Sequence, residues 1–152
     1  RPRVAHPEVM MRVAVVGLSV NEMRPSYFVA KYLQDHGYEV VPVNPKYTEI
    51  LGQKCYASLE EIPGPVHIVD LFQRAEQVMP FVEQAIRIKA NVVWMQLGII
   101  NEAAAEKARA AGLEVIMNRC VKIEYARLFG GLNFAGVNTR LISARRPRFV
   151  VR

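Results

Sequence analysis

The sequence has 152 residues, of which 51% are hydrophobic and 22% charged, which is enough for a substantial core and predicts one domain over residues 1–152. No apolar run is long enough to cross a bilayer and no secretion signal is recognisable, so we expect neither a membrane protein nor a secreted one. The net charge is +6, but five arginines within residues 140–152 supply most of it, which argues against a basic nucleic-acid-binding groove elsewhere.

Apolar strands alternate with amphipathic helices along the chain. In chain order we expect a strand over 13–16, a helix over 25–36, a strand over 39–43, one helical turn over 58–61, a strand over 67–72, a helix over 75–89, a strand over 91–96, a helix over 101–111, a strand over 114–117 and a last helix over 121–128. Gly37 and Gly112 follow the first and third of these helices, where glycine commonly ends a helix, and Asn101 is suited to cap the third.

The strands are apolar throughout, which indicates a sheet that is buried on both faces and therefore parallel. Right-handed crossover connections then predict an α/β fold with a doubly wound, five-stranded parallel sheet of the Rossmann-like type. We expect the strand order 3-2-1-4-5, a folded core over residues 11–132 and a basic tail over residues 140–152.

The turn after the first strand has the form of a phosphate site. Gly17-Leu18-Ser19 follows this strand, and the next helix begins near Pro25-Ser26. Backbone N–H groups and the positive end of the helix dipole would meet at this turn, which favours an anion. The dinucleotide fingerprint G-x-G-x-x-G is not met, because Ser19 and Glu22 stand at its second and third glycine positions. We therefore expect a phosphate site, but not an ordinary NAD site.

Ligands of such a sheet bind outside the carboxyl ends of its strands. Cations follow three of the five predicted strands, at Lys46, Arg74 and Arg119, and Arg24 lies beside the start of the first helix. This distribution suits a ligand with several phosphates. Asn44 and Lys46 stand where NAD-binding proteins have an acidic residue for the ribose, and a lysine there suits a phosphorylated ribose. NADP, coenzyme A (CoA) and other nucleotides with a ribose phosphate remain open at this point.

Six ordered blocks resemble the small stand-alone CoA-binding proteins, which are similar to the CoA-binding domain of the succinyl-CoA synthetase alpha subunit. The blocks are Gly17-Leu18-Ser19, Arg24-Pro25-Ser26-Tyr27, Pro42-Val43-Asn44-Pro45-Lys46, Gly52-x-Lys54-Cys55-Tyr56, Trp94-Met95-Gln96-Leu97-Gly98 and Asn118-Arg119-Cys120. The resemblance covers residues 11–132 and implies a Rossmann-like fold that binds CoA or an acyl-CoA. It implies binding without catalysis, because the catalytic histidine of the synthetase lies in another domain.

The resemblance also implies where the ligand lies. The turn at Ser19 and the helix start near Ser26 would face phosphates, Lys46 would lie near the ribose phosphate or adenine, and Phe72 and residues 96–98 would border the adenine and pantetheine. Arg74 is the position retained from a pair of arginines common in the family, and Asn118 replaces a common aspartate. The expected ligand-binding residues are Gly17, Ser19, Arg24, Ser26, Asn44, Pro45, Lys46, Phe72, Arg74, Gln96, Leu97 and Gly98; no catalytic or metal-binding residue is expected.

Two other functions stay open beside CoA binding. Cys55 and Cys120 form no metal or redox pair and indicate free thiols in a reducing cytoplasm. We expect a structural thiol at Cys120; the alternative is that the cations beside it lower its pKa, as an NADP-linked or acyl-CoA-linked enzyme would need. The second alternative is an interaction module whose basic tail, residues 140–152, contacts nucleic acid or a partner chain. We expect a solvated tail and no nucleic-acid ligand, and we leave a homodimer or a partner protein open.

Overall fold

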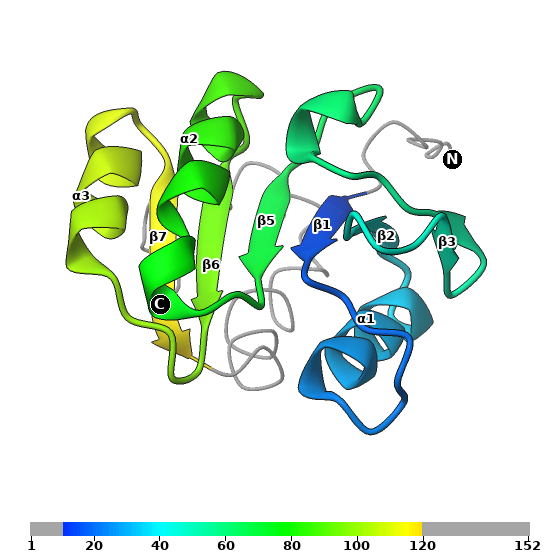
Figure 1. Ribbon diagram of the computed structural model, residues 1–152. Helices are drawn as coiled ribbons and strands as arrows, with labels where there is room; N and C mark the ends of the chain where they lie inside the picture. Colours follow the sequence, from blue (N-terminus) through cyan, green and yellow to red (C-terminus); the bar gives the residue numbers. More distant parts are fainter. Residues whose placement is uncertain (1–10, 120–152) are drawn as a thin grey trace.

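A five-stranded sheet forms the centre of this computed structural model, which describes residues 11–119 (Figure 1). Its strands are β1 (Arg12–Val16), β2 (Glu39–Val43), β5 (Ile68–Leu71), β6 (Val92–Gln96) and β7 (Glu114–Arg119), and every neighbouring pair is parallel. The expected α/β, Rossmann-like sheet of five parallel strands is confirmed. The predictions for a helix over 121–128, for Cys120 and for the basic tail lie outside the described residues.

The strand order differs from the order that the sequence suggested. It is β2-β1-β5-β6-β7, which is 2-1-3-4-5 when the five strands are counted along the chain, and not 3-2-1-4-5. The long segment after β2 carries the chain back past β1, so β5 pairs with the free side of β1, with Val13 opposite Ile68 and Val16 opposite Leu71. The sequence did not distinguish the two orders, because right-handed crossovers between apolar strands permit both. The topological switch point therefore lies between β1 and β5.

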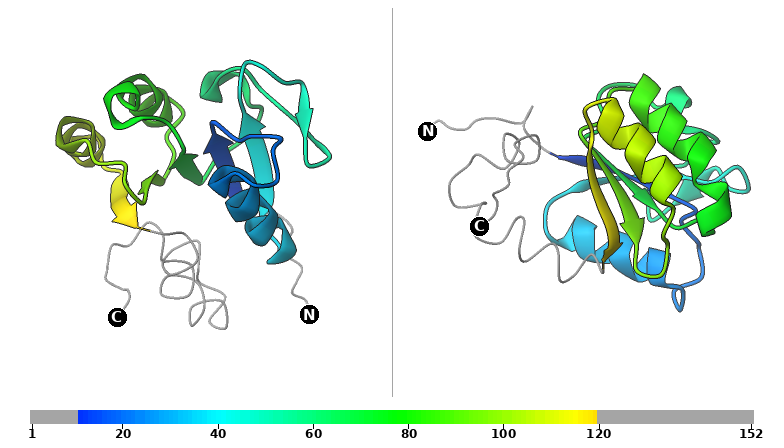
Figure 2. Two further views of the ribbon diagram at one scale, coloured as in Figure 1. Left: turned by 60° about the horizontal axis from the view of Figure 1, so that its bottom comes forward. Right: turned by 90° about the vertical axis from the view of Figure 1, so that its left-hand side faces the viewer.

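Helices cover both faces of the sheet, as Figure 2 shows. Helix α1 (Pro25–Asp35) packs on one face through Val29, Ala30 and Leu33. Helices α2 (Met79–Arg87) and α3 (Glu102–Ala110) pack on the other face through small and β-branched side chains such as Val82 and Ala104. The alternation of the β-strand side chains thus supplies two apolar cores, one on each side of the sheet.

The helix boundaries follow from local chemistry. The segment expected as one helix over 75–89 is a 3₁₀ turn, η3 (Ala75–Gln77), followed by α2, because Pro80 lies in the first helical turn, where its missing N–H costs nothing. The Asn101 side chain accepts the Ala104 N–H at 3.0 Å and caps α3 as expected. Gly37, at φ +90°, follows the end of α1.

The connection between β2 and β5 holds the remaining elements. It contains a short hairpin of β3 (Glu49–Ile50) and β4 (Gln53–Lys54), and then the 3₁₀ turn η2 (Leu59–Glu61). Leu59 is fully buried in the core on the α2 side, which fixes this connection against the sheet.

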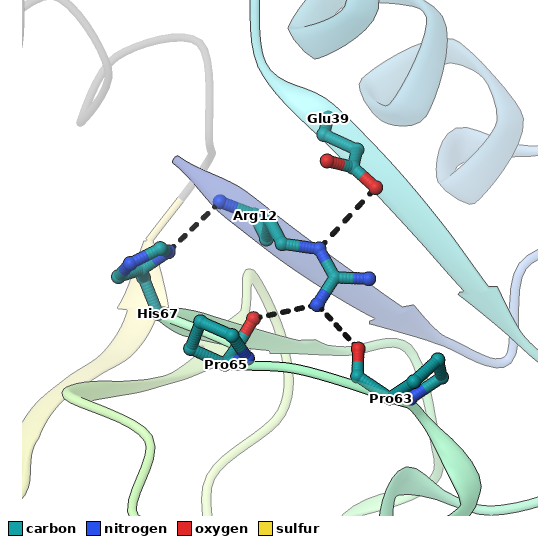
Figure 3. Close-up of polar contacts among 5 residues, drawn as sticks. All are labelled: Arg12, Glu39, Pro63, Pro65 and His67. Atoms are coloured by element: carbon teal, nitrogen blue, oxygen red, sulfur yellow. Dashed lines mark hydrogen bonds and ion pairs between the residues drawn. The ribbon is translucent and has the colours of Figure 1, made fainter. Parts of the chain in front are cut away.

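A polar cluster closes the amino edge of the sheet (Figure 3). The Arg12 guanidinium donates to the carbonyl oxygens of Pro63 and Pro65, each at 2.8 Å, and forms an ion pair with Glu39 at 3.2 Å. The Arg12 backbone N–H donates to Nδ1 of His67 at 3.0 Å. Burial and the nearby Arg12 charge lower the pKa of His67, so the neutral ring that accepts this N–H is favoured. These contacts join β1, β2 and the segment that leads into β5.

Candidate functional site

A cavity of about 270 Å³ opens at the carboxyl edge of the sheet, opposite the Arg12 cluster. It lies between the β1–α1 loop, the start of α1, the end of β5 and the β6–α3 loop. Its lining residues are Gly17, Ser19, Arg24, Pro25, Ser26, Phe72, Gln73 and Ile99. This is the position at which ligands bind in doubly wound sheets, next to the switch point between β1 and β5.

Gly17 allows the β1–α1 loop to pass very close to the end of β5. The residue has φ +87°, and a Cβ atom there would lie 2.5 Å from the Phe72 carbonyl oxygen and 3.0 Å from Nε2 of Gln73. The Gly17 N–H donates to the Val43 carbonyl at 2.8 Å, and the Phe72 N–H donates to the Val16 carbonyl at 2.9 Å. A side chain at this position would therefore push apart the strand ends that form the wall of the cavity.

The loop after Gly17 is held by its own side chains. The Ser19 N–H donates to Oγ of Ser26 at 3.0 Å, and the Asn21 N–H donates to Oγ of Ser19 at 2.9 Å. The Ser19 N–H is therefore not free for a phosphate, although the turn suggested that role. Helix α1 has Arg24 at its N-cap and no side-chain cap, so its dipole and the Arg24 guanidinium are what the cavity offers to an anion.

Asn44 joins the end of β2 to the β1–α1 loop. Its Nδ2 donates to the Leu18 carbonyl at 3.0 Å, and its Oδ1 accepts the Lys46 N–H at 2.9 Å. These bonds form a turn that leaves Pro45 and Lys46 exposed outside the cavity lining. Asn44 thus has a positioning role in the unliganded protein, and Lys46 is available to a ligand that extends beyond the cavity.

Next to this turn, Cys55 is buried and its thiol donates to the Asn44 carbonyl at 3.3 Å. Burial raises the pKa of the Cys55 thiol, so the group remains a neutral structural thiol. The Lys54 ammonium lies 5.2 Å from the centroid of the Tyr56 ring, in a cation–π contact on the same segment.

A buried carboxyl group lies in the sheet below the strand ends. Asp70 of β5 is fully buried, its Oδ1 accepts a hydrogen bond from Nε2 of Gln96, and its Oδ2 has no partner. Burial raises the pKa of Asp70 to about 7, and the hydrogen bond from Gln96 opposes the rise. Gln96 was expected to border the ligand, but its side chain is directed at Asp70 and does not line the cavity. The signal for Asp70 is one acidic residue in an otherwise apolar strand.

The β6–α3 loop forms the remaining wall. The Gly98 N–H donates to Oδ1 of Asn118 at 2.7 Å, and the Ile99 N–H donates to the Gln96 carbonyl at 2.8 Å. Ile99 lines the cavity, whereas Leu97 and Gly98 are exposed beside it.

Five of the expected site residues therefore line one cavity, and seven lie elsewhere. Those in the lining are Gly17, Ser19, Arg24, Ser26 and Phe72. Arg74 is exposed at the start of η3, and Asn44, Pro45, Lys46, Gln96, Leu97 and Gly98 lie as described above. The sequence interpretation missed Pro25, Gln73 and Ile99 in the lining. Their adjacency to Arg24, Phe72 and Gly98 is the signal that could have found them.

The parallel sheet, the glycine turn and the helix start without a side-chain cap define a Rossmann-like α/β protein, and they are typical of nucleotide-binding members of that class. The family model described as a CoA binding domain matches residues 11–126, so this chain belongs to the CoA-binding-domain family. The uncharacterized protein YneT of Bacillus subtilis is 45% identical over 115 residues, which cover 76% of this chain and 85% of YneT.

Solved and curated relatives agree with this assignment. A hypothetical protein from Pyrococcus horikoshii OT3 has a TM-score of 0.75 and 46% identity, over 79% of this chain and 84% of that one. Acetate–CoA ligase (ADP-forming) I of Archaeoglobus fulgidus is 38% identical over 85 residues, which are 56% of this chain but only 12% of the ligase. The similarity to the ligase thus concerns a small part of a much longer protein, and the finer likeness to the succinyl-CoA synthetase alpha subunit stays a prediction.

Neither a membrane-spanning helix nor a metal-binding cluster is found among the described residues. No helix between residues 11 and 119 is long and apolar enough to span a membrane. Over the same residues, no group of three or more His, Cys, Asp or Glu side chains is placed to hold a metal ion.

Proposed function

We propose that this chain binds CoA or an acyl-CoA non-covalently at the cavity on the carboxyl edge of the sheet, without catalysing a reaction on it. Membership of the CoA-binding-domain family supports the ligand class. The single observation that carries the location is the cavity itself, in which Gly17, the start of α1 and Arg24 meet beside the switch point.

The ligand would run across the edge of the sheet. Its pyrophosphate would lie at the start of α1 beside Arg24, because this is where the lining offers positive charge. The ribose phosphate and adenine would extend toward Lys46, which Asn44 holds exposed at the end of β2. The pantetheine arm would then run toward the β6–α3 loop, on the other side of the cavity.

The chemistry of the lining supports binding without catalysis. Among the described residues, none of the eight that line the cavity is an acid, a histidine or a cysteine, so this part of the wall supplies no general base and no thiol nucleophile. The Ser19 hydroxyl accepts the Asn21 N–H and has no base among these residues.

Calorimetry with CoA, NADP and NAD tests the proposal. We expect CoA to bind most tightly, and Arg24→Ala to weaken CoA binding by about 1–3 kcal/mol, which is the usual effect of losing a charged hydrogen-bond donor. Arg109→Ala removes the same charge from an exposed site near the end of α3 and serves as the matched control. Tighter binding of NAD or NADP, or equal losses in the two variants, would contradict the proposal.

A further inference from the structure

The carboxyl group of Asp70 lies in an apolar part of the sheet. Asp70 is opposite Val15 of β1 and Trp94 of β6, and it shares their face of the sheet, which carries the core on the α1 side. Its Oδ1 accepts a hydrogen bond from Nε2 of Gln96, and its buried Oδ2 has no partner among the described residues. An ionised carboxylate here would be a buried charge, whereas the neutral acid leaves only a hydroxyl unpaired. The surroundings therefore favour the neutral acid.

No charged group among the described residues compensates for ionisation of Asp70. Helix α1 packs on the same face, but its charged residues Lys31 and Asp35, and Arg24 before it, are exposed. The ion pairs of the described residues do not include Asp70. Burial raises the pKa of Asp70 to about 7, the hydrogen bond from Gln96 opposes the rise, and no charged group contributes. The carboxyl group therefore loses its proton near neutral pH.

Gln96 connects this carboxyl group to the wall of the cavity. Strands β5 and β6 lie side by side (Figure 1), and their pairing ends where Leu71 is opposite Met95, one residue before Gln96. The Gln96 carbonyl accepts the Ile99 N–H at 2.8 Å, and Ile99 lines the cavity. The β6–α3 loop thus begins at a residue whose side chain is bonded to Asp70.

The sheet is irregular on the other side of Gln96. The register between β6 and β7 shifts between Met95 and Gln96, and Asn118, which lies in the shifted part of β7, has φ +61°. Oδ1 of Asn118 accepts the Gly98 N–H at 2.7 Å. Such irregularities commonly redirect a side chain beside a functional site. The bond between Asp70 and Gln96 is therefore placed to set where the β6–α3 loop leaves the sheet.

We infer that Asp70 is a positioning residue of the ligand site: as the neutral acid it holds Gln96, and through Gln96 the Ile99 wall, in the arrangement that binds CoA. This inference rests on the proposed function, which runs the pantetheine arm toward the β6–α3 loop. Ionisation would place an uncompensated charge at Oδ2 and draw water into the end of β5, which would displace Gln96 and the loop. CoA would then bind the protonated protein more tightly, and binding would take up a proton.

Calorimetry on the full chain with dephospho-CoA, at pH 7 in PIPES and in imidazole buffer, measures this proton uptake. Dephospho-CoA is used because it lacks the ribose phosphate, which itself titrates near neutral pH. A group with a pKa of about 7 is half ionised at pH 7, so we expect uptake of up to about half a proton for each ligand bound. The affinity should fall by up to about tenfold from pH 6 to pH 8, because only the protonated fraction binds.

Two aspartate variants separate Asp70 from the other groups of the protein. Asp70→Asn keeps an acceptor for Gln96 but does not titrate, so it should bind dephospho-CoA with no proton uptake and with an affinity that does not change between pH 6 and pH 8. Asp35→Asn removes an exposed carboxylate, which is paired with Lys31, and should retain both effects.

Hydrogen exchange tests the link to the loop without a ligand and without a substitution. The Ile99 N–H is bonded to the Gln96 carbonyl, and the Gly17 N–H, in another wall of the cavity, is bonded to the Val43 carbonyl. After correction for the intrinsic effect of pH on exchange, protection of the Ile99 amide should fall more between pH 6 and pH 8 than protection of the Gly17 amide. Equal losses at both amides would mean that ionisation acts only on global stability, and would overturn the inference.

The outcomes separate this inference from the proposed function. Binding of dephospho-CoA by the wild-type protein without proton uptake, or with equal uptake in Asp70→Asn, would overturn the inference and leave the proposed function in place. A purely structural role for Asp70 predicts that Asp70→Asn changes the unfolding free energy but not the pH dependence of affinity. Failure of both CoA and dephospho-CoA to bind the wild-type protein at pH 6 and at pH 8 would overturn the proposed function, and the inference with it.

Discussion

The two edges of the same sheet use their charged side chains differently. At the amino edge, Arg12 is bonded to Pro63, Pro65 and Glu39 (Figure 3). At the carboxyl edge, Arg24, Lys46 and Arg74 form no ion pair with any described residue. The cation at the amino edge thus makes internal contacts, whereas these three cations at the carboxyl edge have no acidic partner among the described residues.

The apolar side chains show the same contrast. Val66, which leads into β5 at the amino edge, is buried, whereas the loops at the other edge expose four large apolar side chains: Val20, Met23, Leu97 and Ile100. Burial of apolar surface and satisfaction of polar groups stabilise the fold, and both are left incomplete where the ligand is proposed to bind. The contrast shows that charged side chains are paired within the fold at the amino edge and left without such partners, among the described residues, at the edge where we propose that the ligand binds. Substitutions of exposed side chains at the carboxyl edge should therefore change ligand affinity without changing the unfolding free energy, whereas substitutions in the Arg12 cluster should do the reverse.

The largest expected effect on unfolding free energy comes from Gly17→Ala, which places a Cβ atom between the ends of β1 and β5 at the carboxyl edge. The new Cβ would lie 2.5 Å from the Phe72 carbonyl oxygen in a backbone at φ +87°. We expect a loss of about 3 kcal/mol in unfolding free energy, measured by urea denaturation, together with weaker CoA binding.

Gly112→Ala is the matched control for this substitution. Gly112 has a similar φ of +93°, but a Cβ there meets nothing within 4 Å. It should therefore cost only the backbone strain, about 1 kcal/mol, and leave CoA affinity unchanged. Equal losses in the two alanine variants would mean that the close approach of β1 and β5 is not what requires glycine.

The next effect concerns the buried carboxyl group below the site. Because burial raises the pKa of Asp70 to about 7, the unfolded chain releases this proton at lower pH than the folded protein does. The contribution of Asp70 is therefore fully present at low pH and is lost as the pH rises from about 4 to about 7. We expect urea denaturation to show a decrease of roughly 2–4 kcal/mol over this window, and Asp70→Asn to remove it.

An exposed aspartate supplies the control for the Asp70 experiment. Asp35 forms an exposed ion pair with Lys31 at 3.0 Å, so Asp35→Asn should leave the decrease between pH 4 and pH 7 in place. If Asp70→Asn retains the decrease as well, the carboxyl group is not the origin of it.

The sequence predicted the strands of this fold but not their order. Periodicity predicted all five strands, and the strand expected over 39–43 coincides with β2. Periodicity describes which side chains are buried, but not which neighbour a strand selects. The position of β5 beside β1 depends on contacts between distant segments, and for that reason the predicted strand order was wrong.

In the candidate site too, the sequence predicted residues that lie close together along the chain better than contacts between distant segments. Gly17, Arg24 and Ser26 belong to one continuous segment, and the sequence placed them together correctly. The family resemblance placed Gln96 beside the ligand, but the strand register shifts between Met95 and Gln96, and the Gln96 side chain contacts Asp70. Ile99 reaches the cavity from a loop that Asn118 holds from another strand. Such contacts between segments are not visible in local patterns.

A smaller effect on CoA affinity tests whether Lys46, the exposed cation after β2, contacts the ribose phosphate. Lys46→Ala should weaken CoA binding by about 1–3 kcal/mol without changing the unfolding free energy, because Lys46 is exposed and unpaired within the described residues. The loss should shrink with dephospho-CoA, which lacks the ribose phosphate. Equal losses for the two ligands, measured by calorimetry, would reject the placement of this phosphate beside Lys46.

The smallest effect concerns the amino edge and has the opposite pH dependence. Burial and the Arg12 charge lower the pKa of His67, so the folded protein resists protonation more than the unfolded chain does. The stability that neutral His67 supplies is complete above about pH 6.5 and is lost as the pH falls through the lower, folded-state value. Because the ring is only half-buried, we expect this loss to be smaller than the Asp70 effect. His67→Asn keeps an acceptor for the Arg12 N–H but does not titrate, so this loss should disappear.

The effect of His67 on the unfolding free energy is best measured in the Asp70→Asn variant, because the titration of Asp70 no longer contributes there. There, urea denaturation at pH 7 and pH 5 should show a loss of stability with His67 and none with His67→Asn. CoA affinity should be the same in both proteins at pH 7, because the Arg12 cluster lies at the edge opposite the cavity. A change in CoA affinity on His67→Asn would show that the two edges are coupled through the strands between them, and the separation of stability from binding would then be wrong.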